Sequence, residues 1–340
     1  MALNSEHEES DSLIIDRRED RSFLMLLLQS LIKPFRPRLT KVSEPSHAGS
    51  RRLTPPCKKL RQHEVHERHV EHVWIYDVTF RGKSLESSSL RRIYYFAGGG
   101  WQMPPSAQHW ALVAALAQRL ANTIVSVVSY PLAPDNPASV SMPQLQRLYR
   151  VLMEQSGRQG ERVVFAGDSA GGNVALSLVL WCSEASSEDE AALHHVPDAV
   201  FAISPSTDLR HEDANIGVFA KRDPILTPDS IKSTAAAWCK GGASQAESHD
   251  WTASDGRVSP ILGPLEQFAN KGISVHGVIG TADVLAPEAL VFMERCRELR
   301  VRGRWLVWEK QMHCFPLAFT YGLPECIESL DWIVQVLSHG

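Results

Sequence analysis

The order of apolar segments along the chain predicts an α/β protein built on a mostly parallel sheet. From residue 73 onward, short apolar runs rich in β-branched residues alternate with longer amphipathic runs. Strands covered by helices on both faces have this composition, whereas a sheet with one solvated face alternates apolar and polar residues. A serine framed by glycines, in GDSAGG at 167–172, lies between one such strand and one such helix. These observations predict a helix-covered sheet with a nucleophile at its carboxyl edge.

Each expected element follows from its local pattern. Strands are expected where apolar and β-branched residues cluster, at 73–80, 92–96, 124–129, 163–166, 199–203, 274–279 and 304–308. Helices are expected where apolar residues recur at helical spacing, at 107–122, 142–155, 173–182, 228–238, 287–299 and 324–337. Between about 208 and 256 the sequence turns polar and interrupts the alternation, which is typical of an inserted cap.

The chain is expected to divide into three parts. Residues 1–22 are expected to form an acidic, disordered tail, because seven acidic side chains face three arginines up to residue 21. Residues 23–72 are expected to form an N-terminal cap helix and a linker. Residues 73–340 are expected to form the catalytic domain, with the cap insertion at about 208–256.

The apolar run FLMLLLQSLI at 23–32 has two interpretations. It is either a helix that packs over the body of the protein or an interfacial anchor helped by Lys33, Arg36 and Arg38. A helix needs about 20 residues to cross a bilayer, so no transmembrane span is expected.

Composition excludes several classes of protein. The chain has 340 residues, 44% of them hydrophobic, and a net charge of −4, so a large core is expected and a basic surface for nucleic acid is not. The six cysteines are widely spaced and an acidic segment precedes the first apolar run. Both features favour a reducing, cytoplasmic location without a secretory signal. A homodimer stays open at this stage.

Ser169 is the candidate nucleophile. It stands in a GxSxG frame after a short apolar strand and before a buried helix, the setting of a strained strand-to-helix turn. Gly167 and Gly171 leave room where a Cβ would collide with a neighbouring element. The N–H of Ala170, the next residue, is expected to face a developing oxyanion.

A serine hydroxyl needs an imidazole base, which is itself oriented by a carboxylate. Asp283 in GTADVL and His313 in KQMHCF each follow an expected strand. Because the carboxyl ends of parallel strands meet at one edge of the sheet, both are expected beside Ser169. Asp208 also follows a strand and is the rival acid, but it begins the polar segment and is expected to be structural.

The segment AGGGW at 97–101 follows another expected strand. Consecutive glycines let backbone N–H groups approach a substrate oxygen without obstruction from side chains. Gly98, Gly99 and Gly100 are therefore the candidate partners of Ala170 in an oxyanion hole. Gly99 and Gly100 are expected to donate, and Gly98 to shape the turn.

Together these motifs resemble the hormone-sensitive-lipase-like carboxylesterases of the α/β-hydrolase fold. AGGGW stands where that family has HGGG, SYPLAPDNPAS is similar to its YRLAPE segment, and GDSAGGN, two SP pairs, GTADVL and MHCF follow in order. The resemblance runs from about residue 73 to the C-terminus. It implies a mostly parallel eight-stranded sheet flanked by helices, a helical cap, and ester hydrolysis through an acyl-enzyme without metal or organic cofactor. Ala97 departs from the family histidine and puts the stiffness of the glycine loop in doubt.

The expected substrate is a small-molecule ester, with a short acyl group such as acetyl on an apolar body. Candidate residues for the substrate pocket are Trp101, Met103, Trp238 and Phe315. A weaker resemblance, in the style of the N-terminus, is to fungal enzymes of secondary metabolism. Alternatives are a transacylase, a lactonase, a thioesterase, an enzyme that assists cyclisation, or a non-catalytic small-molecule receptor.

Two further features have competing interpretations. His63, His66, His69 and His72 recur every three residues, which would suit a metal site on a helix, but a solvated entry segment is favoured and no metal is expected. Cys314 lies beside the candidate base and is expected to be a small core residue rather than a nucleophile.

Overall fold

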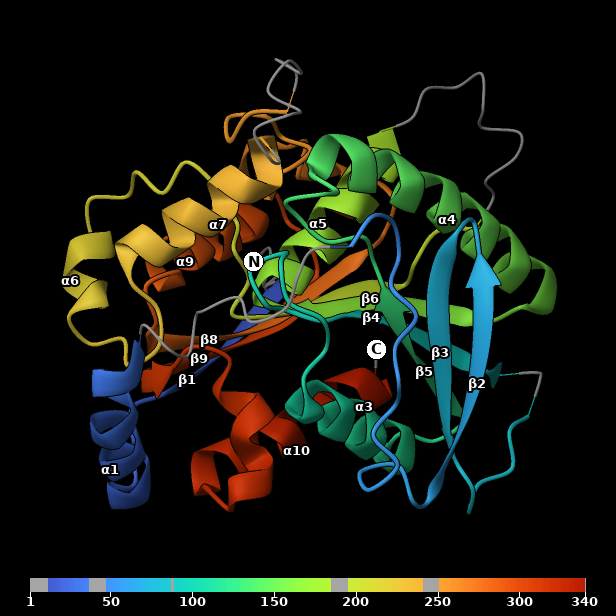
Figure 1. Cartoon of the computed structure of the whole chain (residues 1–340), viewed down its shortest axis with the longest axis horizontal. Helices are drawn as coiled ribbons and strands as arrows, with labels where there is room; N and C mark the ends of the chain where they lie inside the picture. The colour runs from blue at the N-terminus through green and yellow to red at the C-terminus, as the bar shows by residue number, and fades with distance from the viewer. Residues whose placement is uncertain (1–11, 37–46, 87–88, 185–194, 241–250, 340) are drawn as a thin grey trace, which may run out of the picture.

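The computed structural model describes residues 12–36, 47–86, 89–184, 195–240 and 251–339. This part of the chain forms one nine-stranded sheet in the order β1-β9-β8-β7-β6-β4-β5-β3-β2 (Figure 1). Neighbouring strands are parallel except at β2–β3 and β3–β5, which are antiparallel. The strands are β1 (Leu13–Arg18), β2 (His63–Val70), β3 (Val73–Phe80), β4 (Arg91–Phe96), β5 (Thr123–Ser129), β6 (Arg162–Asp168), β7 (Ala199–Ile203), β8 (Ser274–Ala282) and β9 (Gly303–Met312).

Helices cover both faces of the sheet. In Figure 1, α4, α5, α7 and α9 lie on one side, and α1, α3 and α10 lie on the other. The α-helices are α1 (Phe23–Ile32), α3 (Ala107–Arg119), α4 (Ala138–Gln159), α5 (Ser169–Glu184), α6 (Ile216–Ala220), α7 (Pro228–Lys240), α8 (Glu266–Asn270), α9 (Ala286–Glu298) and α10 (Pro324–His339). The 3₁₀ turns are η1 (Lys33–Phe35), η4 (Pro260–Leu262) and η5 (Phe315–Tyr321).

The two faces carry separate hydrophobic cores, and β4 shows why the expected strands are apolar throughout. Tyr94 and Phe96 belong to the core beneath α4 and α5, whereas Ile93 and Tyr95 belong to the core beneath α3 and α10. Successive side chains of a strand point to opposite faces, so a strand buried on both sides needs an apolar residue at every position. The predicted α/β class is confirmed on this basis.

The expectation of a disordered tail at 1–22 was wrong for residues 13–18. They form β1, which adds a ninth strand parallel to β9, with Leu13 opposite Gly303. Asp16 is held by the Arg304 guanidinium at 2.9 Å and by the Trp332 indole N–H at 2.7 Å. These polar anchors lie 288 and 316 residues further along the chain, so they left no local signal in the tail. The expected disorder of residues 1–11 concerns a segment outside the described residues.

The helix expected at 23–32 is present as α1, but it does not form a cap over the pocket. Ser22 caps its first turn and donates from Oγ to Glu325 Oε2 at 3.0 Å, and Gln29 Nε2 donates to the Lys310 carbonyl at 2.8 Å. These contacts dock α1 against the end of β9 and the start of α10, where Phe23 stays 75% exposed. Within the described ranges, no helix is both long and apolar enough to cross a membrane.

The histidine run lies in and just after β2, and so belongs to the sheet rather than to a segment before it, but it is largely solvated as expected: only His63 is buried, and the other three histidines are exposed. In a strand, residues three apart point to opposite faces, so His63 and His66 do not face a common point. The His63 Nε2 lies 2.9 Å from the Ala114 carbonyl, and His69 stacks on Trp74 with ring centroids 4.3 Å apart. In the described part of the chain, no group of three or more metal-ligating side chains is assembled.

The cap expected at about 208–256 contains α6 and α7. Helix α7 lies above the carboxyl edge of the sheet, on the same side as α5 (Figure 1). Residues 241–250 of this insertion lie outside the described residues.

Candidate active site

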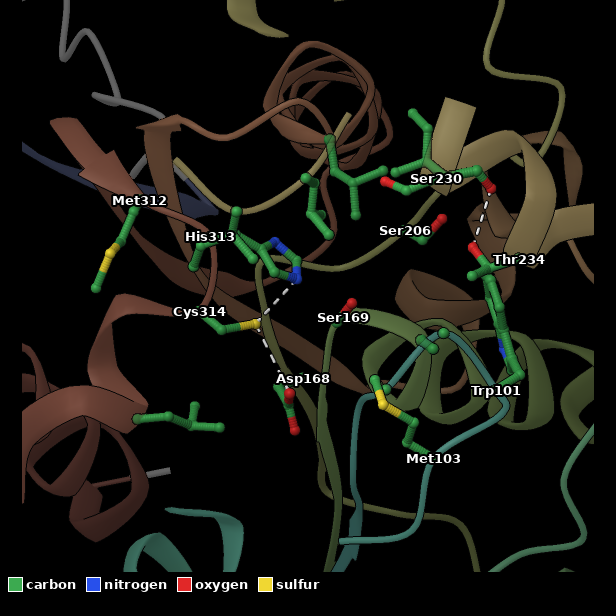
Figure 2. Close-up of a pocket in the computed structure, with 18 of the residues that line it drawn as sticks. Trp101, Met103, Asp168, Ser169, Ser206, Ser230, Thr234, Met312, His313 and Cys314 are labelled. Atoms are coloured by element: carbon green, nitrogen blue, oxygen red, sulfur yellow. Dashed lines mark hydrogen bonds between the residues drawn. The ribbon is translucent and has the colours of Figure 1, made fainter. Parts of the chain in front are cut away.

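Ser169 lies where β6 meets α5. Its φ of +52° is in the left-handed region, which is the strain expected at such a turn. A Cβ at Gly171 would run into the carbonyl of Phe96 on β4, so only glycine lets α5 begin this close to the sheet. The turn lifts the Ser169 side chain to the edge of a cavity (Figure 2).

Asp283 and His313 follow β8 and β9 and meet at the same edge of the sheet. His313 Nδ1 lies 2.7 Å from Asp283 Oδ2, and Asp283 Oδ1 accepts the N–H of Leu285 at 2.9 Å. Donation from Nδ1 to the carboxylate leaves the lone pair of neutral histidine on Nε2. Burial alone would lower the pKa of His313, but the Asp283 carboxylate raises it well above its usual value. This arrangement suits a general base.

Ser169 and His313 line the same cavity, but they are not hydrogen-bonded to each other in this structure. His313 Nε2 lies 3.4 Å from Cys314 Sγ, the contact drawn as a dashed line in Figure 2. No hydrogen bond joins it to Ser169 Oγ in the part of the chain that the structure describes. Catalytic hydrogen bonds are often long in empty sites and tighten when substrate binds.

The glycine loop supplies backbone donors at the cavity. Gly99 and Gly100 line it with φ of +127° and +60°, and their N–H groups have no hydrogen-bond partner among the described residues. The N–H of Ala170 is in the first turn of α5, where it has no partner within the helix. Gly98 differs, because its N–H donates to Asp168 Oδ1 at 3.0 Å. Gly98 was grouped with the oxyanion-hole residues, but its N–H is used within the protein, so it is not a donor there; this agrees with the turn-shaping role expected for it.

Asp168 braces the glycine loop from below. Besides Gly98, its carboxylate accepts hydrogen bonds from the Tyr95 hydroxyl at 2.6 Å and from His109 Nε2 at 3.2 Å. His109 Nδ1 accepts the N–H of Ser106, so the ring proton is on Nε2 and points at Asp168. Burial alone would raise the pKa of Asp168, but His109 and then the Tyr95 and Gly98 hydrogen bonds lower it. The loop is thus held without a histidine at position 97.

The cavity has a volume of about 240 Å³. Trp101 and Met103 lie in its wall, as expected from the sequence. Trp238 and Phe315 do not, and the expectation that they line the pocket is corrected. Trp238 is fully buried and stacks behind Trp101 with ring centroids 5.8 Å apart, and Phe315 packs edge-on against Trp308 at 5.7 Å.

Many wall residues were missed by the sequence analysis. Those in or next to the cap are Ser206, His211, Ile225, Leu226, Ser230, Ile231 and Thr234, and those on other elements are Gln108, His109, Asp168, Leu285, Met312, Leu317 and Ala318. The polar segment at 208–256 was the available signal, because a cap inserted after a strand end must lie near the site. It gave no indication of which side chains would point inward.

Asp208, the rival acid, does not contact His313. Its carboxylate pairs with the Arg210 guanidinium at 2.6 Å and accepts the Arg210 backbone N–H at 3.0 Å. Its structural role is that of a turn former at the start of the cap.

Asp223 is a second buried carboxylate near the candidate acid, and no sequence pattern indicated it. Its Oδ2 accepts the N–H of Val284 at 2.8 Å, and its Oδ1 accepts those of Ile225 and Leu226 at 2.6 and 2.9 Å. Burial, followed by the charge of Asp283, raises the pKa of Asp223 to about 6. The Asp223 carboxylate therefore links the cap wall at Ile225 and Leu226 to the loop that carries Asp283.

Cys314 is half-buried and lines the cavity with a φ of +50°. Its Sγ lies 3.7 Å from Asp168 Oδ2, in addition to its contact with His313. Burial raises the pKa of this thiol to about 12, which disfavours the thiolate that a nucleophilic cysteine needs.

Comparison with known proteins defines the family. Residues 93–317 match the family model described as alpha/beta hydrolase fold, so the chain belongs to this family of α/β hydrolases.

Three similar proteins have esterase or lipase names. An esterase from Acinetobacter venetianus is 24% identical over 257 residues, which cover 75% of this chain and 78% of that protein. Human hormone-sensitive lipase is 30% identical over 176 residues, which cover 50% of this chain and 15% of the lipase. The solved structure of carboxyl esterase 2 from the fungus Tuber melanosporum superposes with a TM-score of 0.73 at 21% identity, over 94% of this chain and 99% of that one. The expected relation to the hormone-sensitive-lipase-like esterases is confirmed.

Proposed function

We propose that this protein is a serine esterase that cleaves a carboxylic ester of a small molecule through an acyl-enzyme. The observation that carries the proposal is the 2.7 Å contact between His313 Nδ1 and Asp283 Oδ2, at a cavity that also holds Ser169 on a strained turn. The esterase names of the relatives support the same reaction.

In the proposed mechanism, Ser169 Oγ attacks the ester carbonyl while His313 Nε2 takes the hydroxyl proton. Asp283 stabilises the imidazolium that forms. The tetrahedral oxyanion accepts hydrogen bonds from the N–H groups of Gly99, Gly100 and Ala170. His313 then returns the proton to the departing alcohol, which leaves the acyl group on Ser169. Water, deprotonated by the same imidazole, releases the carboxylic acid and restores the serine.

The cavity favours a short acyl group. Its volume of about 240 Å³ is below the roughly 300–1,000 Å³ typical of sites for drug-sized ligands. Much of its wall is apolar, with Ile225, Leu226, Ile231, Leu285 and Leu317 among the lining residues. We therefore expect acetyl to butyryl esters to be better substrates than long-chain ones.

The proposed setting is the cytoplasm, on an acylated product of secondary metabolism. The absence of paired thiols supports a reducing compartment: all six cysteines are free in the structure. The receptor alternative is disfavoured because the chain has Ser169, Asp283 and His313 together, and because Gly99 and Gly100 of the glycine loop line the same cavity as Ser169.

Hydrolysis of p-nitrophenyl acetate, butyrate, octanoate and palmitate by the wild type and by Ser169→Ala tests the proposal. We expect turnover that falls with chain length beyond butyrate and is lost in Ser169→Ala. Ser183→Ala is the matched control, because it removes another buried hydroxyl from α5, one bonded only to the Val179 carbonyl. Equal turnover by Ser169→Ala and the wild type would contradict the proposal. Formation of mainly transesterified product from an added alcohol, with little free acid, would contradict it as well.

A further inference from the structure

Three residues of the cavity wall each have a buried polar atom without a hydrogen-bond partner among the described residues. These atoms are Trp101 Nε1, Ser206 Oγ and His211 Nε2. A buried polar group without a partner costs about 1–3 kcal/mol. The glycine-loop donors and His313 are used by the ester itself, so these atoms are available to a different part of the substrate.

His211 is held in a fixed orientation by a carboxylate outside the cavity wall. Its Nδ1 lies 2.9 Å from Glu288 Oε2 on α9, and the two side chains are 1% and 3% exposed. In the tautomer that donates from Nδ1 to the carboxylate, Nε2 has a lone pair on the other side of the ring. A lone pair of this kind is satisfied only by a donor.

Ser206 lies directly beside the candidate nucleophile. Its backbone N–H donates to the Ser169 carbonyl at 3.3 Å, and its own carbonyl accepts from Asn173 Nδ2 at 2.8 Å. These two bonds fix the backbone, and they leave the Ser206 hydroxyl free to donate or accept. Figure 2 shows Ser206 and Ser169 among the side chains around the same cavity.

We propose that Ser206 and His211 form a polar subsite that binds a hydroxyl group of the substrate, so that the preferred ester carries a hydroxyl near its scissile bond. This inference rests on the proposed esterase function and specifies its substrate class. A hydroxyl matches both atoms, because it donates to His211 Nε2 and accepts from Ser206 Oγ. A ketone or a second ester cannot donate to His211. The Asp168 carboxylate, also in the wall, is already occupied by Tyr95, Gly98 and His109 and offers no competing site.

Two pairs of esters that differ only by a hydroxyl test the subsite. The first pair is p-nitrophenyl butyrate and p-nitrophenyl 3-hydroxybutyrate, which vary the acyl side. The second is butyl butyrate and 4-hydroxybutyl butyrate, which vary the alcohol side. We expect the wild type to favour the hydroxylated ester in at least one pair by about tenfold in kcat/KM, because a site built to bond a hydroxyl rejects the analogue that lacks it.

Ser206→Ala and His211→Phe should each bring that ratio close to one. Ser206→Ala removes a hydroxyl that has no internal partner among the described residues, so folding is expected to survive even where His211→Phe destabilises the cap. Ser177→Ala is the matched control: Ser177 Oγ is likewise buried and unpartnered, but it lies outside the cavity wall, so the ratio should not change.

The possible failures are distinguishable. A wild type that hydrolyses none of the four esters would contradict the proposed function. A wild type that hydrolyses them with ratios near one in both pairs would overturn the subsite alone. Retention of a tenfold ratio in Ser206→Ala and in folded His211→Phe would also overturn it.

Discussion

Tyr95→Phe should loosen the glycine loop and destabilise the fold. The Tyr95 hydroxyl donates to Asp168 Oδ1 at 2.6 Å, and the same oxygen accepts the Gly98 N–H that holds the loop. Asp168 is 3% exposed, so no bulk solvent replaces the lost donor. A hydrogen bond to a charged group contributes about 1.5–3 kcal/mol, and we expect the free energy of unfolding to fall by that amount.

Tyr130→Phe provides a comparison on the same loop. The Tyr130 hydroxyl donates to the Ala97 carbonyl at 2.9 Å, and both partners are neutral. A neutral hydrogen bond contributes about 1 kcal/mol, so Tyr130→Phe should cost less than Tyr95→Phe. Both rings are buried, which keeps the loss of packing similar in the two variants.

Urea unfolding and hydrolysis of p-nitrophenyl acetate measure the two consequences. Deleting one oxyanion-hole donor lowers kcat by roughly 10²–10³-fold. A loosened loop keeps its donors, so we expect a smaller fall in the kcat of Tyr95→Phe, by about 10-fold. Equal unfolding free energies for the wild type and Tyr95→Phe, together with equal kcat, would refute the role given to Asp168. An equal loss of unfolding free energy in Tyr130→Phe and Tyr95→Phe would show that the charge of Asp168 does not account for the loss.

Three further predictions concern the carboxylates and the thiol. Since Asp283 raises the pKa of His313, the acidic limb of the pH profile of kcat/KM should lie above pH 6.5, and a limb at or below pH 6.5 would contradict this effect of Asp283. Asp283→Asn should lower kcat by about 10³–10⁴-fold. The folded pKa of Asp223, about 6, exceeds its usual 3.8, so its contribution to stability is fully present below pH 3.8 and is lost as pH rises from there through 6. Asp223→Asn should remove this loss in urea titrations carried out between about pH 3.8 and 6, and an unchanged pH dependence of the unfolding free energy would count against it. Iodoacetamide at pH 8 should label the exposed Cys57 but not Cys314, because the pKa of Cys314 is about 12; peptide maps would show which thiol is modified. Rapid labelling of Cys314 would instead show that its thiol ionises readily.

The sheet and the chemistry-bearing residues were predictable because their signals are local. The strands at 73–80 and 199–203 have the expected bounds, and Ser169, Asp283 and His313 each follow a strand end as expected. In a parallel sheet, the pattern of strand ends is enough to bring distant residues to one edge.

Features that depend on tertiary contacts were not predictable. β1 lies in an acidic segment, and it pairs with a strand almost 300 residues away. The brace on the glycine loop comes from Asp168, Tyr95 and His109, which lie on three different elements. Trp238 and Phe315 were expected in the pocket because of their type and position, but their rings fill the core behind it. Aromatic side chains have the same sequence signature in both settings.

Covalent labelling of the candidate nucleophile tests the central claim most directly. The wild type and Ser169→Ala would each be treated with a fluorophosphonate, and the intact mass and the modified peptide would be determined. We predict one adduct per chain, on Ser169, with loss of esterase activity in proportion to labelling and no adduct in Ser169→Ala. An adduct on another residue, or full ester turnover by an unlabelled Ser169→Ala protein, would contradict the account.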